Sequence, residues 1–315
     1  SACNFIFSTA ATIATTNMQT LTLCNSSTGN IIFSGGNVGI GTTTPLTRLH
    51  ATVDNSNSAG VVDLATLTHT VSGTGFSPDN GSSLTTGLIS YWKIDEASGS
   101  TAADAYGSNT GTATGTTIVA GKLGNARSFN GTSSDYVSVP DSTSLDITSA
   151  ITIGTWVKLN SVATAYQTIV GKVDATINEA NYAFRTGTGA NSDELEFYFY
   201  ANSTWQVYLT TNANLATATW YHLVVAYSGS TVAIYKNGTL LSGSCTSGTC
   251  NIAMIADNNT LGLGNPGNVS QLINGTIDEV GIWSKALSAQ EITDLYNSGT
   301  GNTYNSSTAG NAGIG

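Results

Sequence analysis

The stretch NGTIDEVGIWSKALSAQEITDLYNSG, residues 274–299, decides the fold because it joins an expected strand directly to an expected helix. Apolar and polar residues alternate over residues 276–283, which is typical of a β-strand. Ser288 and Glu291 have the spacing of a helix capping box, and Gly299 is a typical C-terminal stop. The stretch therefore predicts a strand followed by one short helix, whose apolar stripe must dock on a sheet.

Two neighbouring acids lie inside this expected strand. Strict alternation puts Glu279 on the same face as Ile277 and Trp283. It puts Asp278 on the opposite face, together with Val280. We therefore do not expect Asp278 and Glu279 to act together as a catalytic pair.

The composition is unusually poor in charge. Charged residues make up 9% of the 315 residues, against about a quarter in ordinary globular domains, and the net charge is −10. The nine basic residues are scattered, which argues against nucleic acid or an anionic membrane surface as a partner. No apolar run approaches the ~18 residues of a membrane-spanning helix, so we expect no membrane insertion.

The four cysteines are close in sequence as two pairs, Cys3 with Cys24 and Cys245 with Cys250. Neither pair has the spacing of a metal site, and proximity favours two local disulfides over the other connectivities. Disulfides indicate an oxidising compartment. A first residue other than Met is also what removal of a signal peptide would leave. We therefore expect a protein that is secreted and lies outside the cell or on its surface.

The pattern changes along the chain. Residues 1–73 show short β runs with few large apolar residues, which favours a β-rich segment that gains stability by assembly. Residues 74–87 have the Gly, Ser and Pro content of a linker. Residues 88–304 contain many alternating strands and all five tryptophans, which is typical of a β-sandwich. Residues 305–315 form a tail rich in Gly, Asn and Ser.

Five separated segments of residues 88–304 resemble the laminin-G-like, concanavalin A-like jelly roll, and they occur in that family's order. They are LISYWKIDEASGSTAADAYGSNTGT (89–112), GKLGNARSFNGTSSDYVSVP (121–140), ITIGTWVKL (151–159), TWYHLVVAYSGSTVAIYKNGTLL (219–241) and NGTIDEVGIWSKALSAQEITDLY (274–296). The resemblance implies an all-β fold of two antiparallel sheets, with one short C-terminal helix that caps the edge of the sandwich.

The first part of the chain resembles other proteins. GGNVGIGTTTPLTRLHATV and LATLTHTVSGT look like segments of phage tail-fibre and bacterial surface-fibre proteins. In addition, the pattern at residues 25–41 recurs at residues 305–315. A repeating fibre, in which the strands of one copy pair with those of the next, would explain this echo. The chain's partner would then be itself, as a homopolymer or a closed homotrimer. The alternative is a disordered tail.

Catalysis is not expected. Glucanases that share this sandwich carry three carboxylates on one face of one strand, and the nearest stretch here is SDELEFYF. Glu194 and Glu196 share a face, but Tyr198 stands where a further acid should follow. The three histidines, His50, His69 and His222, are not part of any recognisable catalytic motif.

A structural calcium ion is a second hypothesis, because the resemblance implies one near the joined first and last strands. The matching acids are Asp95, Asp104 and Asp278. Calcium needs several hard oxygen ligands, which carboxylates supply. In the alternative interpretation Asp95 and Asp278 accept hydrogen bonds from turn amides, and Asp104 forms an Asx-turn.

Sugar binding is a third hypothesis, because stacking on sugars needs exposed aromatic rings. Alternation turns Tyr198 and Tyr200 outward, and Tyr208 on the next run could join them. The residues between them, Leu195, Phe197 and Phe199, would face the core. Tyrosines on exposed strand faces are common, however, and need not bind anything.

The sequence leads us to expect a secreted structural subunit of an extracellular fibre or filament, which displays a laminin-G-like domain and assembles by strand pairing between subunits. The alternative is a carbohydrate-binding adhesin module, monomeric or trimeric. An enzyme acting on glycans is the third and disfavoured possibility.

Overall fold

A computed structural model describes most of residues 84–302 and two short segments before them. The described residues are 38–40, 49–51, 84–132, 135–162, 166–173, 180–187, 194–264 and 271–302. The chain divides into two compact units, Ser1–Thr74 and Gly75–Gly315.

In the first unit, β1 (Val38–Ile40) and β2 (Leu49–Ala51) pair in parallel, with Val38 opposite Leu49. The predicted disulfide between Cys3 and Cys24 lies outside the described residues, as do residues 305–315. The predicted role of these segments in assembly therefore stays a prediction.

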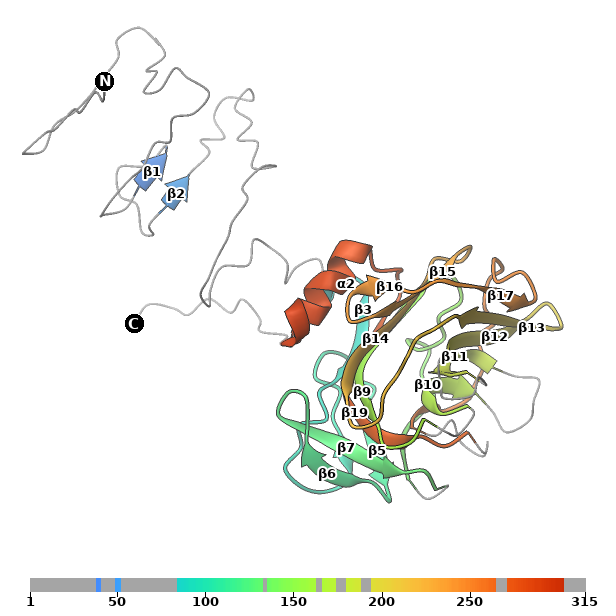
Figure 1. The fold of residues 1–315 in the computed structure, drawn as a ribbon, viewed down its shortest axis with the longest axis horizontal. Coiled ribbons are helices and arrows are strands. Elements are labelled where there is room, and N and C mark those ends of the chain that lie inside the picture. The colour runs from blue at the N-terminus through green and yellow to red at the C-terminus, as the bar shows by residue number, and fades with distance from the viewer. Residues whose placement is uncertain are drawn as a thin grey trace, which may run out of the picture. The chain divides into compact units, whose positions relative to one another are not determined.

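The second unit is a sandwich of two antiparallel sheets (Figure 1). Sheet 1 consists, in spatial order, of β17 (Gly243–Ser247), β13 (Thr204–Thr210), β12 (Leu195–Ala201), β11 (Ala180–Thr186), β10 (Thr168–Val173), β18 (Leu261–Leu263), β8 (Tyr136–Val139), β5 (Gly111–Thr114) and β4 (Thr101–Ala102). Sheet 2 consists of β16 (Thr239–Leu240), β15 (Val232–Lys236), β14 (Trp220–Tyr227), β9 (Ile151–Leu159), β19 (Asn274–Trp283), β7 (Asn125–Asn130) and β6 (Thr117–Ala120), with β3 (Leu88–Trp92) beside β19. The predicted two-sheet jelly roll is confirmed.

Alternating side chains from both sheets form the core between them. On β12, Leu195, Phe197 and Phe199 point inward and are almost fully buried, as predicted. They meet residues of sheet 2 such as Val225 and Ile153. Burial of apolar surface of this kind is the main stabilising term of the fold.

The predicted helix is α2 (Ala289–Tyr296), and its capping box is present. The backbone N–H of Glu291 donates to the Ser288 hydroxyl, and the N–H of Ser288 donates to the Glu291 carboxylate at 2.8 Å. Its apolar stripe packs on the outer face of sheet 2, against Trp283 among others. The helix ends earlier than expected, because Asn297 takes the left-handed cap conformation and Gly299 only closes a short 3₁₀ turn (η1, Asn297–Gly299).

The expectation of strict alternation in β19 is wrong. A bulge interrupts its pairing with β9 between Asp278 and Gly281, and Glu279 has a φ of 54° there. As a result Ile277 and Val280 both point into the core, although alternation would have separated them. The sequence rule failed because a bulge inserts one extra residue into a strand, which shifts the face of every later residue.

The sandwich also begins before residue 88. Leu84 is buried with the apolar stripe of α2, and the indole N–H of Trp283 donates to the carbonyl of Leu84 at 2.6 Å. The end of the predicted linker thus belongs to the folded unit. No helix in the described part of the chain is long and apolar enough to span a membrane.

Candidate functional site

The outer face of sheet 1 carries a row of apolar side chains across β11, β12 and β13. Ala183, Tyr198 and Val207 are directly opposite one another in these strands. Because their neighbours Phe184 and Phe197 point into the core, this row must point away from it. The row forms a small apolar cluster separate from the core.

A buried ion pair lies beside this row. Arg185 of β11 faces Glu196 of β12 and donates to its Oε1 from Nε at 2.8 Å and also from Nη2. Nη1 donates to the side-chain oxygen of Gln271 at 2.5 Å. Burial raises the pKa of Glu196 more than the charge and hydrogen bonds of Arg185 lower it. The ring centres of Tyr166 and Tyr198 lie 3.9 and 4.0 Å from the central guanidinium carbon, in cation–π contact.

Trp205 of β13 lies between two tyrosines. Its ring is 5.6 Å from that of Tyr198 and 5.2 Å from that of Tyr200, with the planes at 61° and 67°. Such edge-to-face contacts are favourable and fix the orientation of the indole. Trp205 and Tyr200 are half-buried. We call these two residues the aromatic ridge.

The three predicted sugar-binding tyrosines are not equivalent. Tyr200 lies on the ridge, as alternation indicated. Tyr198 also points outward but is only 6% exposed, and burial raises its pKa to about 12. The expectation is wrong for Tyr208, which is directly opposite Phe197 and packs against the core. It cannot join the other two because residues that face each other across two strands share a face.

Sequence reasoning missed Trp205, and one signal could have found it. Asn202 and Ser203 both have positive φ and form the tight turn between β12 and β13. A two-residue turn fixes the register, so Trp205 must face Tyr200. The turn was not recognised in the sequence, and without it the register that sends Tyr208 inward could not be assigned.

A loop closed by a disulfide is hydrogen-bonded to the strand that carries Trp205. The predicted bond between Cys245 and Cys250 is present. The Ser247 hydroxyl donates to the Trp205 carbonyl at 3.0 Å, and the backbone N–H of Cys250 donates to the Gln206 side chain, also at 3.0 Å. The loop therefore anchors β13 at the edge of sheet 1.

The three acids predicted to bind calcium are held by backbone amides. Asp104 accepts from four of them, the N–H groups of Tyr91, Tyr106, Gly107 and Asn109. Asp95 accepts from the N–H of Asn125 at 2.8 Å. Oδ2 of Asp278 accepts from the N–H groups of residues 122 and 123 at 2.7 and 2.9 Å. This is the turn-amide arrangement that was the alternative interpretation.

These acids fit a shared calcium ion only in part. Both oxygens of Asp104 already accept amide hydrogens, so Asp104 does not fit. Oδ1 of Asp278 is buried without a well-formed hydrogen bond, which leaves one oxygen that a cation could use. Burial, together with a smaller effect of the nearby Asp95 carboxylate, raises the pKa of Asp278 to about 7. No three acidic, histidine or cysteine side chains in the described ranges are grouped as a metal site. Calcium at Asp95 and Asp278 stays a prediction.

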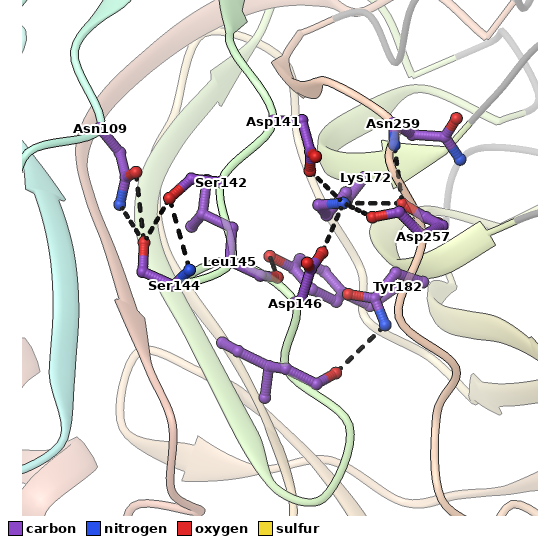
Figure 2. A network of polar contacts seen from close by, with 12 residues as sticks. Asn109, Asp141, Ser142, Ser144, Leu145, Asp146, Lys172, Tyr182, Asp257 and Asn259 are labelled. Carbon is purple, nitrogen blue, oxygen red and sulfur yellow. Dashed lines mark hydrogen bonds and ion pairs between the residues drawn. The ribbon is translucent and has the colours of Figure 1, made fainter.

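A second polar cluster surrounds Lys172 of β10 (Figure 2), which is directly opposite the core residue Tyr182 and therefore points inward. Its ammonium group lies 2.9 Å from a carboxylate oxygen of Asp141, 2.9 Å from one of Asp146 and 2.7 Å from one of Asp257. Burial lowers the pKa of Lys172, but the hydrogen bonds that its ammonium group donates to these carboxylates outweigh this effect, so the pKa is raised. The group is a closed ion cluster rather than an open site.

The residues considered for catalysis have other roles. Glu196 is committed to Arg185. His222 is buried beside Trp156, at a ring distance of 5.1 Å, and burial lowers its pKa to about 3. His50 lies in β2, and His69 is outside the described residues.

Several solved structures have a similar fold. Domain 4 of AbnA, a GH43 extracellular arabinanase from Geobacillus stearothermophilus, in complex with arabinotriose, superposes with a TM-score of 0.52 at 24% identity, over 66% of this chain and 98% of that one. The binding domain of Paraclostridial Mosquitocidal Protein 1 gives 0.53 at 18% identity, over 67% and 52%. Trypanosoma rangeli sialidase gives 0.53 at 16% identity, over 69% and 34%. The chain thus spans only about half of the toxin domain and a third of the sialidase.

Sequence comparison agrees with the fold. No curated protein sequence matches the chain. The sequence model of one family matches residues 130–293, just over half of the 315 residues. These residues include the inner strands of both sheets and the first half of α2. The chain belongs to the concanavalin A-like lectin/glucanases superfamily.

Proposed function

We propose that the second unit is an extracellular carbohydrate-binding module that uses the aromatic ridge of Trp205 and Tyr200. The observation that carries the proposal is the fixed, half-buried indole of Trp205 between Tyr198 and Tyr200. An ordered apolar ring that needs no rearrangement offers a surface for the C–H groups of a sugar at low entropic cost. Neighbouring polar groups, including the Tyr200 hydroxyl, would supply hydrogen bonds.

Two of the similar solved structures support this proposal. The arabinanase domain was solved with arabinotriose, and the mosquitocidal domain is described as a binding domain. The disulfide at Cys245 and Cys250 supports an oxidising, extracellular setting.

We propose binding without catalysis. Glycoside hydrolysis needs two carboxyl groups free to act as acid and base or nucleophile. On this face Glu196 is taken up by Arg185, and Tyr198 stands two residues later, where an acid would have to project. Incubation of the full chain with arabinan and other neutral polysaccharides should release no reducing ends.

Binding can be tested with a panel of neutral polysaccharides in affinity gel electrophoresis, followed by titration calorimetry with arabinotriose. We expect Trp205→Ala to weaken binding at least about tenfold, because it removes the stacking surface. Trp220→Ala is the matched control, since Trp220 is a half-buried tryptophan on sheet 2. Equal affinity of the Trp205 variant and the wild type would refute a binding site at the ridge.

A second candidate function, the fibre subunit, rests on a different observation. β1 and β2 pair in parallel across residues 41–48, too short a connection for an intervening crossover helix. Successive parallel strands joined by short turns are typical of elongated, stacked β structures. In this proposal the first unit assembles copies of the chain, and the second unit displays the binding module.

A further inference from the structure

Arg185 is the basic side chain that an acidic sugar on the outer face of sheet 1 would have to meet. The described strands of this sheet contain two basic residues, and the other, Lys172, points into the core. Recognition of a carboxylated or sulfated sugar normally uses the paired N–H donors of an arginine. Whether the guanidinium group of Arg185 is already paired within the protein therefore decides whether this face can bind acidic sugars.

Each of the three nitrogens in the guanidinium group of Arg185 already donates a hydrogen bond within the protein. Glu196 accepts from Nε and Nη2, and Gln271 accepts from Nη1. Tyr166 and Tyr198 lie against the group, and only 9% of Arg185 is exposed. We call these four side chains the cage of Arg185. A ligand carboxylate would have to displace Glu196, which gains nothing in charge and loses a buried ion pair.

The charge around Arg185 also disfavours the binding of acidic sugars. Arg185 and Glu196 cancel each other, and Glu194 adds a further carboxylate at the start of the same strand. The whole chain carries a net charge of −10. An anionic sugar approaching this face would meet repulsion without a compensating cation.

We propose that the ridge takes uncharged sugars, and that Glu196 sets this selectivity by neutralising Arg185. The inference rests on the proposed function, because it names the class of sugar bound at the same site. It makes Glu196 a residue that rejects a class of ligand, which is one of the two ways to build specificity.

The test is Glu196→Gln, which keeps the side-chain shape and an oxygen for Arg185 but leaves one uncompensated positive charge. Glu194→Gln is the matched control, because it makes the same change in net charge on the same face outside the cage. Each protein is titrated with arabinotriose and with trigalacturonate at low and at high salt. We expect Glu196→Gln to bind trigalacturonate at least about tenfold more tightly than the wild type at low salt, with the gain reduced at high salt.

The outcomes separate the two proposals. Wild-type binding of arabinotriose but not trigalacturonate, with a gain for trigalacturonate only in Glu196→Gln, supports both. If the wild type binds neither sugar but Glu196→Gln gains trigalacturonate, the role of Glu196 holds and glycan binding by the wild type loses its support. Wild-type binding of trigalacturonate as tight as that of arabinotriose would overturn the inference, as would an equal gain in Glu194→Gln. Circular dichroism and thermal melting show whether each variant is folded, and a folded Glu196→Gln protein without any gain also overturns it.

Discussion

Lys172 makes two hydrogen bonds to Asp257: its ammonium group donates to the backbone carbonyl oxygen at 2.6 Å and to the carboxylate at 2.7 Å (Figure 2). Asp141 and Asp146 complete the cluster from another part of the chain. Residues 140–147 and 251–260 contain no strand or helix, so they have no ladder of backbone hydrogen bonds to hold them. The buried ammonium group of Lys172 thus joins two irregular segments to β10.

Lys172→Met should therefore be strongly destabilising. The variant leaves three carboxylates close together without their cation, and breaking a buried ion pair in this way costs about 3–5 kcal/mol. Urea denaturation of the full chain at neutral pH measures the loss. Lys158→Met is the control, because Lys158 lies over Trp220 on a half-buried strand position and should change the free energy of unfolding by less than about 1 kcal/mol.

The stabilisation from Lys172 should not vary between pH 6 and 9. Its pKa is raised above the ordinary 10.5, so the ammonium form is kept in the folded protein throughout this range. The contribution is present below the ordinary pKa and is lost only as the pH rises through the higher folded value. A difference between wild type and Lys172→Met that disappears by pH 9 would contradict this assignment.

Loss of the disulfide should act locally. Cys245→Ser with Cys250→Ser opens a short loop, for which chain entropy predicts a cost of about 2 kcal/mol. The amides of β13 and β17 should exchange hydrogen faster, while those of β14 and β9 should not. Mass spectrometry of non-reduced peptides checks the bond itself, and the same digest tests the predicted Cys3–Cys24 bond. Uniformly faster exchange across both sheets would show that the disulfide stabilises the whole sandwich instead.

Sequence reasoning predicted the sandwich and its helix because both depend on local patterns. The Ser288–Glu291 capping box and the alternation around Phe197 can be read directly, and the structure confirms both. The predictions about the faces of individual side chains were less accurate. Tyr208 and the face of Val280 depend on register, which one tight turn and one bulge control. The cage of Arg185 involves residues from distant parts of the chain, so no short pattern could indicate it.

The buried acids of β19 should make stability depend on pH. Burial raises the pKa of Asp278 to about 7 and that of Glu279 to about 8. Because both pKa values are raised in the folded state, the contribution of these two acids to stability is greatest below the ordinary carboxyl pKa and falls as the pH rises toward 8. Asp278→Asn should make the free energy of unfolding depend less steeply on pH, by at most about 1.4 kcal/mol per pH unit. The amide oxygen of the new side chain can still accept from the N–H groups of residues 122 and 123.

Melting temperatures at pH 5, 6, 7 and 8 check the slope. Glu194→Gln is a control, since it changes the net charge equally at a less buried position. The same series with added chelator or calcium tests the calcium hypothesis. A bound ion would favour the ionised form of Asp278, so calcium should raise the melting temperature of the wild type but not of Asp278→Asn. Parallel pH profiles of wild type and variant without calcium would refute the raised pKa.

Removal of residues 1–73 should leave a folded, monomeric jelly roll. The division into two compact units falls at Thr74 and Gly75, and every core residue of the sandwich in the described part of the chain lies at Leu84 or later. The truncated chain should therefore keep the melting temperature of the full chain's sandwich to within a few degrees. It should also keep its affinity for any sugar that the full chain binds, because the ridge lies wholly in the second unit. Analytical ultracentrifugation and negative-stain microscopy compare the two chains over a range of concentrations.

The full chain should form filaments or trimers if its first unit assembles by strand pairing. Close packing of copies of a chain with 9% charged residues desolvates few ions, which favours such contacts. Repetition without closure gives a filament, and rotation that closes gives a trimer. Deletion of residues 305–315 should weaken assembly without lowering the melting temperature of the sandwich. A full chain that sediments as a monomer at every concentration in oxidising buffer would rule out the fibre subunit and leave the displayed binding module as the function of the chain.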